Sequence, residues 1–266
     1  KNDSIKPTTS SPNMSPLSIA RLLSLSIISQ ALAQRVSFSD RHGRPSCTVH
    51  PGTTNTTDDV PAILEAFERC GHGGDIIFPA NKTYHINSKL NPVVNDVSID
   101  WRGEWVVSLL DRDQAQGIRS QPLTLIQLVF SEDLEYWRNN NYHIEFQNHA
   151  AGFVLTGDHI RIDGHGTGGI DGNGQVWYYD ERNETESATV GATRPGRPMP
   201  FMLWNVSDVD VRNFHVVQPQ LWAINMMNAT NIVFDNIYVN ATSPEAPPGK
   251  NWVQNTDGFS KFRIAP

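Results

Sequence analysis

The clearest pattern in the chain is a repeat of alternating hydrophobic and polar positions in its second half. The segment Asn205–Val216 matches Asn228–Val239 position for position at a shift of 23 residues, and both copies carry Val, Ile, Ala or Phe at alternating sites. A weaker copy, Gly157–Gly164, aligns with the first copy at an offset of 49 residues, near two such periods. Short strands that recur at this period are typical of a stack in which each repeat forms one coil.

The repeat predicts which side chains point inward and which lie at the turns. Alternating apolar side chains are expected to stack on their counterparts in the next coil, and Asn213 and Asn236 are expected to form a ladder of side-chain amides. A leucine-rich repeat has a similar period but needs leucines that these copies lack. The sequence therefore predicts an all-β fold, a right-handed parallel β-helix or solenoid.

One amphipathic helix is predicted near the start of this stack. Asp58 and Asp59 offer an N-terminal cap, and Pro61 suits the first turn. Gly71 is expected to end the helix. The apolar positions at helical spacing are Val60, Ile63, Leu64, Phe67 and Cys70. Because the end of a β-stack presents an unpaired edge, the helix is expected to cap it.

Composition and charge agree with a strand-rich domain. The 266 residues include 19 Gly and 17 Pro, and only 18% are charged, which favours strands joined by many turns. Short strands are expected over Asp75–Pro79 and Thr83–Ile86, with no second helix downstream. The net charge of −7 is spread among interspersed residues, so no basic stripe indicates a nucleic-acid partner.

The N-terminal segment predicts secretion. Residues 14–33 have the form of a signal peptide, with an apolar stretch over Leu17–Leu32 and a small-residue cleavage site at Ala31–Ala33. Residues 1–13 precede a natural start methionine and are interpreted as an upstream extension that is not native. A membrane anchor is the alternative, but the stretch is short and interrupted by serines. The mature domain is expected to cover 34–266, secreted and free of the membrane.

Glycosylation sequons and two cysteines support the same compartment. In an oxidising compartment a Cys47–Cys70 disulfide is expected, whereas two buried free thiols would be favoured in the cytosol. Six N-glycosylation sites are predicted in the mature chain. They are Asn55, Asn81, Asn183, Asn205, Asn228 and Asn240.

Two patterns that resemble cofactor or metal sites are rejected. Gly164–Gly169 matches a dinucleotide fingerprint, but turn residues follow it where that fingerprint needs a helix. His143, Glu145 and His149 have no spacing of a known ligand set. The sequence predicts neither a cofactor nor a metal.

A turn near the C-terminus carries the sharper chemical signal. Asn255-Thr256-Asp257-Gly258 reads as a turn when it is taken alone. It also falls where the coil after Val239 would begin, so Asp257 could project from the same face as its neighbours. Carboxylates on one such face are what cleavage of a glycosidic bond requires.

At this point the sequence resembles glycoside hydrolase family 28, the polygalacturonases and rhamnogalacturonases. The resemblance covers most of Val36–Phe259 and rests on the order and spacing of several motifs. These are Cys47 with Asp58–Cys70, Ile170–Trp177, Arg197-Pro198, Trp204–Ser207, Trp222–Ile224 and Asn255–Gly258. Three further segments resemble the exo-acting fungal subgroup. They are Trp101–Gly103, Tyr136–Asn139 and Asn251–Gln254.

The resemblance implies an inverting hydrolase of pectic polysaccharides. Asp257 would be the catalytic base that activates water, and Asn255 would orient the site or bind sugar. The implied linkage is α-galacturonosyl, in homogalacturonan or rhamnogalacturonan, cleaved from a chain end. No cofactor is implied, and the protein is expected to be a monomer.

Some parts of the family pattern are not found. The family's paired aspartates, its Gly-His-Gly and its Arg-x-Lys clamp follow the Asn255–Gly258 motif, so this chain is expected to be an N-terminal portion with little or no activity. Arg112–Phe130 and Ser260–Pro266 do not continue the family pattern and are interpreted as gene-model artefacts, with a genuine surface loop as the alternative for the first.

Two other functions stay open on the sequence alone. A pectate lyase shares the β-helix but would need calcium-binding acidic clusters and an arginine base, and neither is found. A non-catalytic carbohydrate-binding solenoid would bind oligogalacturonides without turnover. Calcium dependence with unsaturated products would identify the first, and binding without products the second.

Overall fold

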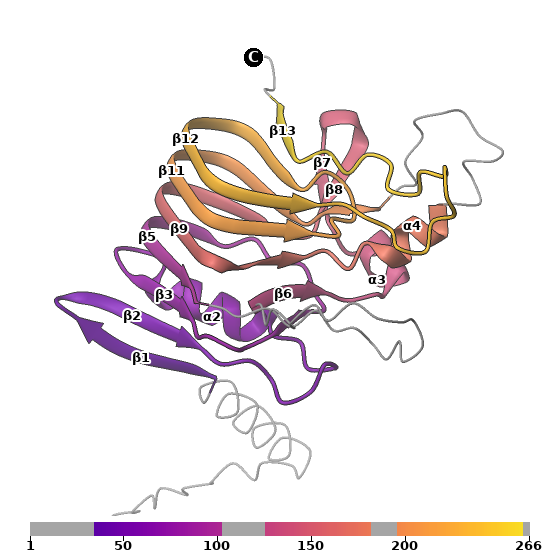
Figure 1. The fold of residues 1–266 in the computed structure, drawn as a ribbon. Coiled ribbons are helices and arrows are strands. Elements are labelled where there is room, and N and C mark those ends of the chain that lie inside the picture. Colours follow the sequence, from indigo (N-terminus) through magenta and orange to yellow (C-terminus); the bar gives the residue numbers. More distant parts are fainter. Residues whose placement is uncertain (1–34, 103–125, 182–195, 263–266) are drawn as a thin grey trace, which may run out of the picture. The chain divides into compact units, whose positions relative to one another are not determined.

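The computed structural model describes residues 35–102, 126–181 and 196–262, and this part of the chain is mostly β (Figure 1). Its strands form a ten-stranded sheet in which neighbours largely follow chain order. The path runs through β1 (Val36–Arg41), β2 (Arg44–Val49), β3 (Asp75–Phe78), β5 (Val93–Trp101), β9 (Val154–Asp171), β11 (Phe201–Val217), β12 (Ile224–Asn240) and β13 (Phe259–Phe262), with β4 (Tyr84–Ile86) and β6 (Ile126–Phe130) beside it. The predicted strand-rich class is confirmed.

The strands stack in parallel with the register that the sequence repeat predicted. β1 and β2 form an antiparallel hairpin, and every later pair in this sheet is parallel. Val209 of β11 pairs with Ile232 of β12, which is the predicted shift of 23 residues, and with Ile160 of β9, which is the predicted offset of 49. Figure 1 shows β5, β9, β11 and β12 as successive layers.

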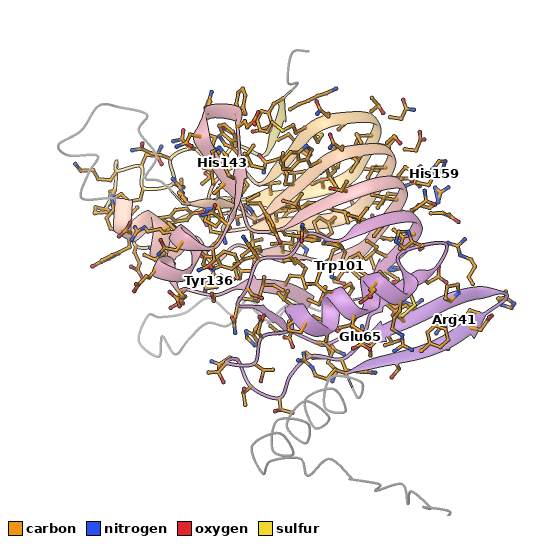
Figure 2. All side chains as sticks on the ribbon, turned by 180° about the vertical axis from the view of Figure 1, so that it is seen from behind. Arg41, Glu65, Trp101, Tyr136, His143 and His159 are labelled. Atoms are coloured by element: carbon orange, nitrogen blue, oxygen red, sulfur yellow. A yellow bond between two sulfur atoms is a disulfide. The ribbon has the colours of Figure 1, made fainter. Side chains whose placement is uncertain are left out.

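Alternate residues of these strands fill one continuous core. Ile99, Ile160, Ile162 and Val211 are buried, as the alternation predicted. Trp101 at the end of β5 is fully buried against Phe78 and Phe214, and Figure 2 shows it inside the stack. Each such side chain contributes roughly 1.5–3 kcal/mol when it leaves water.

The corners of the stack repeat as regularly as the strands. One column of corner residues has a left-handed backbone, with φ between 50° and 54°, and Asn, Asp and His tolerate this conformation better than most residues. The column consists of Asp96, His159, Asp208 and Asn231. His159 marks its exposed position in Figure 2.

Side-chain amides connect neighbouring corners. Asn236 donates its Nδ2 hydrogen bond to Oδ1 of Asn213 at 2.8 Å, and Asn213 donates to Asp163 at 3.1 Å. A second pair, Asn228 to Asn205 at 3.1 Å, repeats this arrangement. The predicted ladder is confirmed, and it satisfies polar groups that alternate with the apolar core.

The predicted helix is present as α2 (Val60–Cys70) at the β2–β3 end of the stack (Figure 1). It ends before Gly71, which has an ordinary negative φ of −74°. A glycine is needed there for space, because a Cβ atom would lie 2.3 Å from the carbonyl oxygen of Phe67. The buried face comprises Val60, Ala62, Ile63, Ala66, Phe67 and Cys70.

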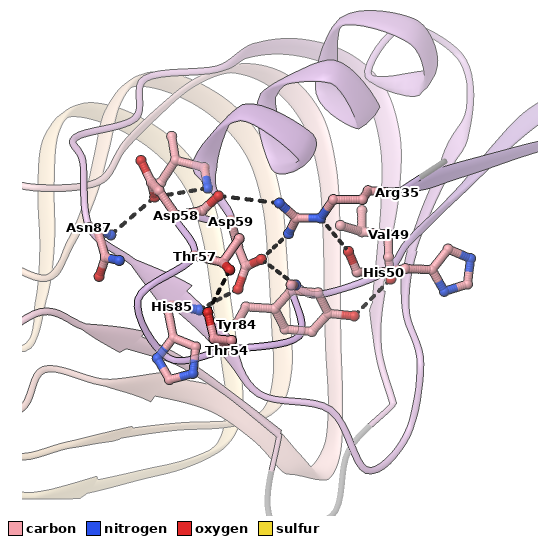
Figure 3. Close-up of polar contacts among 12 residues, drawn as sticks. Arg35, Val49, His50, Thr54, Thr57, Asp58, Asp59, Tyr84, His85 and Asn87 are labelled. Atoms are coloured by element: carbon pink, nitrogen blue, oxygen red, sulfur yellow. Dashed lines mark hydrogen bonds and ion pairs between the residues drawn. The ribbon is translucent and has the colours of Figure 1, made fainter. Parts of the chain in front are cut away.

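The predicted cap is correct for Asp58 and wrong for Asp59. Asp58 Oδ1 accepts the N–H of Val60 at 3.2 Å. The Asp59 side chain makes no capping bond, because it is buried and accepts from Arg35, from the N–H of Gly52 at 2.7 Å and from the N–H of His85 (Figure 3). This buried carboxylate joins the first described residue to the helix and to β4.

The Cys47–Cys70 disulfide is formed. It joins β2 to the last residue of α2, with a Cα–Cα distance of 5.9 Å across 23 residues of sequence. Closing a loop of this size restricts the unfolded chain and stabilises the fold by about 3 kcal/mol. The alternative of two free thiols is therefore excluded for this structure.

Short helices that the sequence did not predict lie beside the stack. They are α3 (Leu134–Asn139), α4 (Gln175–Glu181) and the 3₁₀ turn η1 (Phe146–Asn148). Asp133 caps α3 by accepting the N–H of Tyr136 at 2.8 Å. The expectation of no second helix was wrong because each is two turns or less, too short to show a helical period.

A second sheet joins β7 (Tyr142–Ile144), β8 (His149–Ala151) and β10 (Pro198–Met199).

Two segments interpreted as artefacts take part in the sheet. Residues 126–130 form β6, which pairs with β4 and β9 and buries Leu128 and Phe130. Residues 260–262 belong to β13, which pairs with the start of β12. These residues therefore fit the sheet, and their interpretation as artefacts stays a prediction. Several predicted segments lie outside the described residues: the extension 1–13, the leader 14–33, and the rest of 112–130 and of 260–266.

No helix of the described part is long and apolar enough to cross a membrane.

The glycine-rich segment 164–169 is a corner of β9 and not a helix start. Between Asp163 and Gly168 the register with β11 shifts, so that four residues of β9 stand opposite Asn213 alone. A Cβ at Gly168 would lie 2.6 Å from the carbonyl oxygen of Trp101. Gly168 therefore serves close packing of neighbouring strands, whereas Gly166 has a left-handed φ of 77° and open space around it.

We predict that Arg35→Gln lowers the free energy of unfolding by about 2–4 kcal/mol, because it leaves the buried Asp59 carboxylate without its cation. Urea denaturation at pH 7 measures the change. Arg69→Gln is the matched control, since its ion pair with Glu65 is more exposed and should contribute less than about 0.5 kcal/mol. Equal losses in both variants would contradict the role assigned to Arg35.

Candidate active site

The Asn255–Gly258 turn is fixed to the start of β12 by its backbone. The carbonyl oxygen of Asp257 accepts the N–H of Ala223 at 2.9 Å, and that of Gly258 accepts the N–H of Ile224 at 3.1 Å. Phe259 then pairs with Ile224 as β13 begins. The turn thus stands directly before β13, which pairs with the start of β12.

The side chains of this turn differ in exposure. Asp257 is exposed, whereas Asn255 is half-buried and has a left-handed backbone with φ of 53°. The hydroxyl of Thr256 donates to the carbonyl oxygen of Val253 at 2.7 Å. The Asp257 carboxylate is therefore open to solvent on a backbone that two hydrogen bonds hold in place, so it can contact a ligand without a change of fold.

A buried amide supports the strand start beneath the turn. Asn225 is fully buried and donates through Nδ2 to the carbonyl oxygens of Phe201 at 3.0 Å and of Trp222 at 2.7 Å. These bonds link two successive coils at the level of Ala223. The anchor for Asp257 is therefore itself held in place.

An aromatic cluster lies beside the start of β12. Trp222 contacts the His149 ring edge-on at a centroid distance of 4.5 Å and the Phe262 ring at 5.5 Å. Phe146 stacks on Phe262 at 4.4 Å and is 37% exposed. The aromatic cluster, Phe146, His149, Trp222 and Phe262, joins the β7–β8 hairpin to β13. Because Trp222 directly precedes Ala223, the cluster adjoins the Asp257 turn.

Arg197 lies beneath the same region and is only 1% exposed. Its guanidinium donates to the carbonyl oxygens of Gln220 and, at 2.8 Å, of Gln254. The same group lies 5.9 Å from the ring centroid of Tyr178. A buried cation therefore contacts the backbone on both sides of the site.

Burial changes the protonation of groups near this cation. Burial lowers the pKa of His149, and the positive charge of Arg197 lowers it further. Both effects favour the neutral imidazole. Burial raises the pKa of the Tyr178 hydroxyl, which donates to the carbonyl oxygen of Pro219 at 2.6 Å.

Asp171, in the Ile170–Trp177 motif, has a pKa well above the ordinary value of an aspartate. Burial raises its pKa from 3.8 to about 6, and the hydrogen bond from the N–H of Asn173 opposes that rise. Asp171 closes β9 beside Val217 of β11. Asp171 is half-buried, and its backbone pairs with β11 on one side and with Val129 of β6 on the other.

The other positions that the sequence singled out lie on other elements. His143 is on β7, and Glu145 precedes η1. Four predicted glycosylation sites are exposed, Asn240 is half-buried, and Asn183 lies outside the described residues. The exposed sites are Asn55, Asn81, Asn205 and Asn228. Their modification is still a prediction.

Sequence reasoning missed the residues that support the turn. Arg197 was noted only as part of a motif, and its approach to Gln254 spans 57 residues of sequence. Phe146 and His149 gave no signal that they meet Trp222. The one available hint was an arginine directly before a strand-forming proline, in a domain with few charged residues.

We predict that Asp171→Asn stabilises the protein only at higher pH. Above about pH 6 the native state carries a buried carboxylate that the unfolded chain keeps in water, and this penalty disappears as pH falls toward 3.8. The variant should therefore exceed the parent by about 1–3 kcal/mol at pH 7.5 and match it near pH 4. Urea denaturation at both pH values measures this difference. The exposed Asp235→Asn is the control and should change stability by less than about 0.5 kcal/mol at either pH.

Comparison with known proteins places this site in a family. The sequence model described as glycosyl hydrolases family 28 matches residues 132–263, which include the aromatic cluster, Arg197 and the Asp257 turn. An Aspergillus niger protein named "Putative galacturan 1,4-alpha-galacturonidase C" is 50% identical over 213 residues, which are 80% of this chain and 43% of that protein. Alpha-L-rhamnosidase rgxB of the same species is 32% identical over 248 residues, 92% of this chain and 49% of that protein.

A solved structure agrees with these relatives. The crystal structure of endo-xylogalacturonan hydrolase from Aspergillus tubingensis matches with a TM-score of 0.60 and 27% identity, over 81% of this chain and 47% of that chain. The chain thus spans about half the length of the relatives it matches. The order of motifs, the stacked strands and these matches agree, and the chain belongs to glycoside hydrolase family 28.

Proposed function

We propose that this chain is part of a secreted pectin-degrading hydrolase of the galacturonidase type. The observation that carries the proposal is an exposed Asp257 on a pinned turn, within a chain that is 50% identical to a relative named for galacturan 1,4-alpha-galacturonidase activity. The substrate class is a pectic polysaccharide, cleaved by hydrolysis of an α-galacturonosyl linkage, from the chain end as the sequence resemblance implied.

We propose that the stacked strands are the first coils of a right-handed parallel β-helix. In-register parallel pairing from β5 to β12 and the repeated corner residues support this architecture. The right hand follows from the general rule for crossovers between parallel strands. In such a fold, α2 closes one end of the core.

Asp257 is assigned the role of catalytic base. In an inverting glycosidase the base carboxylate activates a water on the face opposite the leaving group, and the acid carboxyl stands about 6.5–9.5 Å away. An exposed carboxylate that projects at a coil boundary can face a second carboxyl on the next coil. Asn255, two residues earlier, is assigned to sugar binding or to orienting the site.

The aromatic cluster supports a saccharide ligand. Sugar-binding sites use apolar ring faces together with a few placed polar groups, and Trp222 and Phe146 provide such faces next to the Asp257 turn. The neutral His149 adds a polar edge without a positive charge. We therefore assign the cluster to contact with the sugar ring.

The full activity is assigned to the complete family 28 domain. The relatives are about twice as long as the segment matched here, and the acid that protonates the leaving oxygen is proposed to lie in the part of the domain not matched. The 266-residue chain alone is therefore expected to release little or no galacturonic acid.

Secretion and a monomeric state are part of the same proposal. The disulfide is stable in an oxidising compartment, and exposed sequons such as Asn55 and Asn81 are available to glycosylation there. Neither a cofactor nor a metal is assigned to the reaction.

We predict that Asp257→Asn, in the complete family 28 domain that contains this chain, lowers kcat for release of galacturonic acid from polygalacturonan by roughly 10²–10⁴-fold, with KM changed less than about threefold. Removal of the base leaves sugar contacts in place, so the loss should fall on kcat. Reducing-sugar release measures the rate.

Asp235→Asn is the matched control, because it removes an exposed carboxylate that lies on β12 and not in the turn, and it should leave kcat unchanged. Retention of more than a tenth of the activity by Asp257→Asn would contradict the role of Asp257. Unsaturated, calcium-dependent products would identify a lyase, and binding without any product would identify a carbohydrate-binding solenoid.

A further inference from the structure

We infer that Arg197 is a positioning residue that sets the orientation of the Asn255–Asp257 turn from beneath. The inference rests on the proposed function, because it takes Asp257 as the catalytic base. Arg197 does not contact solvent at the site, so it acts through the turn and not on the substrate.

The contacts of Arg197 connect two coils. Its Nε donates to the carbonyl oxygen of Gln220, just before β12, and its Nη2 donates to the carbonyl oxygen of Gln254 at 2.8 Å. Gln220 is itself fully buried. The planar guanidinium can make both bonds at once from fixed directions, whereas a lysine ammonium is a single point with freely rotating donors.

The bond from Arg197 to Gln254 lies directly before the residue at which the chain reverses. It fixes the carbonyl of the peptide that joins Gln254 to Asn255, and Asn255 has the left-handed φ of 53° that reverses the chain. The orientation of that peptide therefore determines the direction in which residues 255–257 leave the protein body.

Two anchors bracket the turn. Arg197 holds it before Asn255, and the N–H of Ala223 holds it at the carbonyl of Asp257, at 2.9 Å. The preceding residues 241–253 contain no strand or helix, so the sheet does not order this side of the turn. Arg197 therefore provides a contact from the protein body on the N-terminal side of the turn, opposite the anchor at Asp257.

The cost of burial also indicates a specific role. Taking a guanidinium out of water costs several kcal/mol unless its donors are satisfied, and an apolar side chain would fill the same space at lower cost. At Arg197 the donors are used on the backbone segments that flank the candidate site. A catalytic base must be held to within about 0.5 Å, and an error of 1 Å can cost about 10²-fold in rate.

The kinetic test compares Arg197→Lys with Arg138→Lys in the complete family 28 domain. Arg138 is the matched control, because it also lies over a buried aromatic ring, at 5.6 Å from the Trp177 centroid, but pairs with Asp180. Arg197→Lys should lower kcat about 10–100-fold with KM changed less than about threefold, and Arg138→Lys should leave both unchanged. Equal changes in both variants, or a change in KM alone, would overturn the inference.

A double variant separates positioning from general damage. If Arg197 acts through Asp257, adding Arg197→Lys to Asp257→Asn should cause no further loss of kcat. An additional loss of tenfold or more would show that Arg197 acts by another route. If Asp257→Asn alone keeps its activity, the proposed function fails, and the exchange experiment below still tests the contact itself.

Hydrogen exchange tests the contact in the 266-residue chain without any activity. In Arg197→Lys, the backbone amides of residues 254–258 should exchange at least tenfold faster, while those of β11 keep their protection. Arg197→Gln, which keeps an amide NH₂ donor without the charge, is the second variant and should show the same faster exchange. Unchanged exchange at 254–258 would overturn the inference, and so would failure of both variants to fold, since Arg197 would then support the fold as a whole.

Discussion

The structure depends on parallel strands that must pair in register with the strand before and the strand after. A slip of one residue would turn the whole apolar face of a strand toward solvent, so register is strongly specified. Every coil must then bend at the same place, which explains the column of left-handed residues from Asp96 to Asn231 and the amide bonds between Asn213 and Asn236. The stack is regular because any irregular coil would break the pairing on both of its sides.

The candidate site uses the points where this regularity is interrupted. Between β12 and β13 the chain leaves the sheet, and the backbone groups at the start of β12 become available to hold Asp257. The β7–β8 hairpin, outside the main sheet, brings Phe146 and His149 to the same place. The stack provides rigid support, and the connections provide the side chains that can meet a ligand.

Electrostatics near the site differ from those of the whole chain. The whole chain has a net charge of −7, which gives no long-range attraction to a polyanion. Arg197 is a buried cation that donates to the backbone carbonyl oxygens of Gln220 and Gln254. Its role is therefore to fix the backbone geometry of the turn.

The sequence by itself determined the features that repeat or stand close together along the chain. The 23-residue register, the amide ladder and the helix from Val60 to Cys70 could all be predicted, because each depends on local periodicity. Only the tertiary structure showed that Asp59 binds Arg35 instead of capping its helix, and that Arg197 meets Gln254. Such contacts join residues whose spacing carries no period, and the folded stack alone brings them within hydrogen-bond distance.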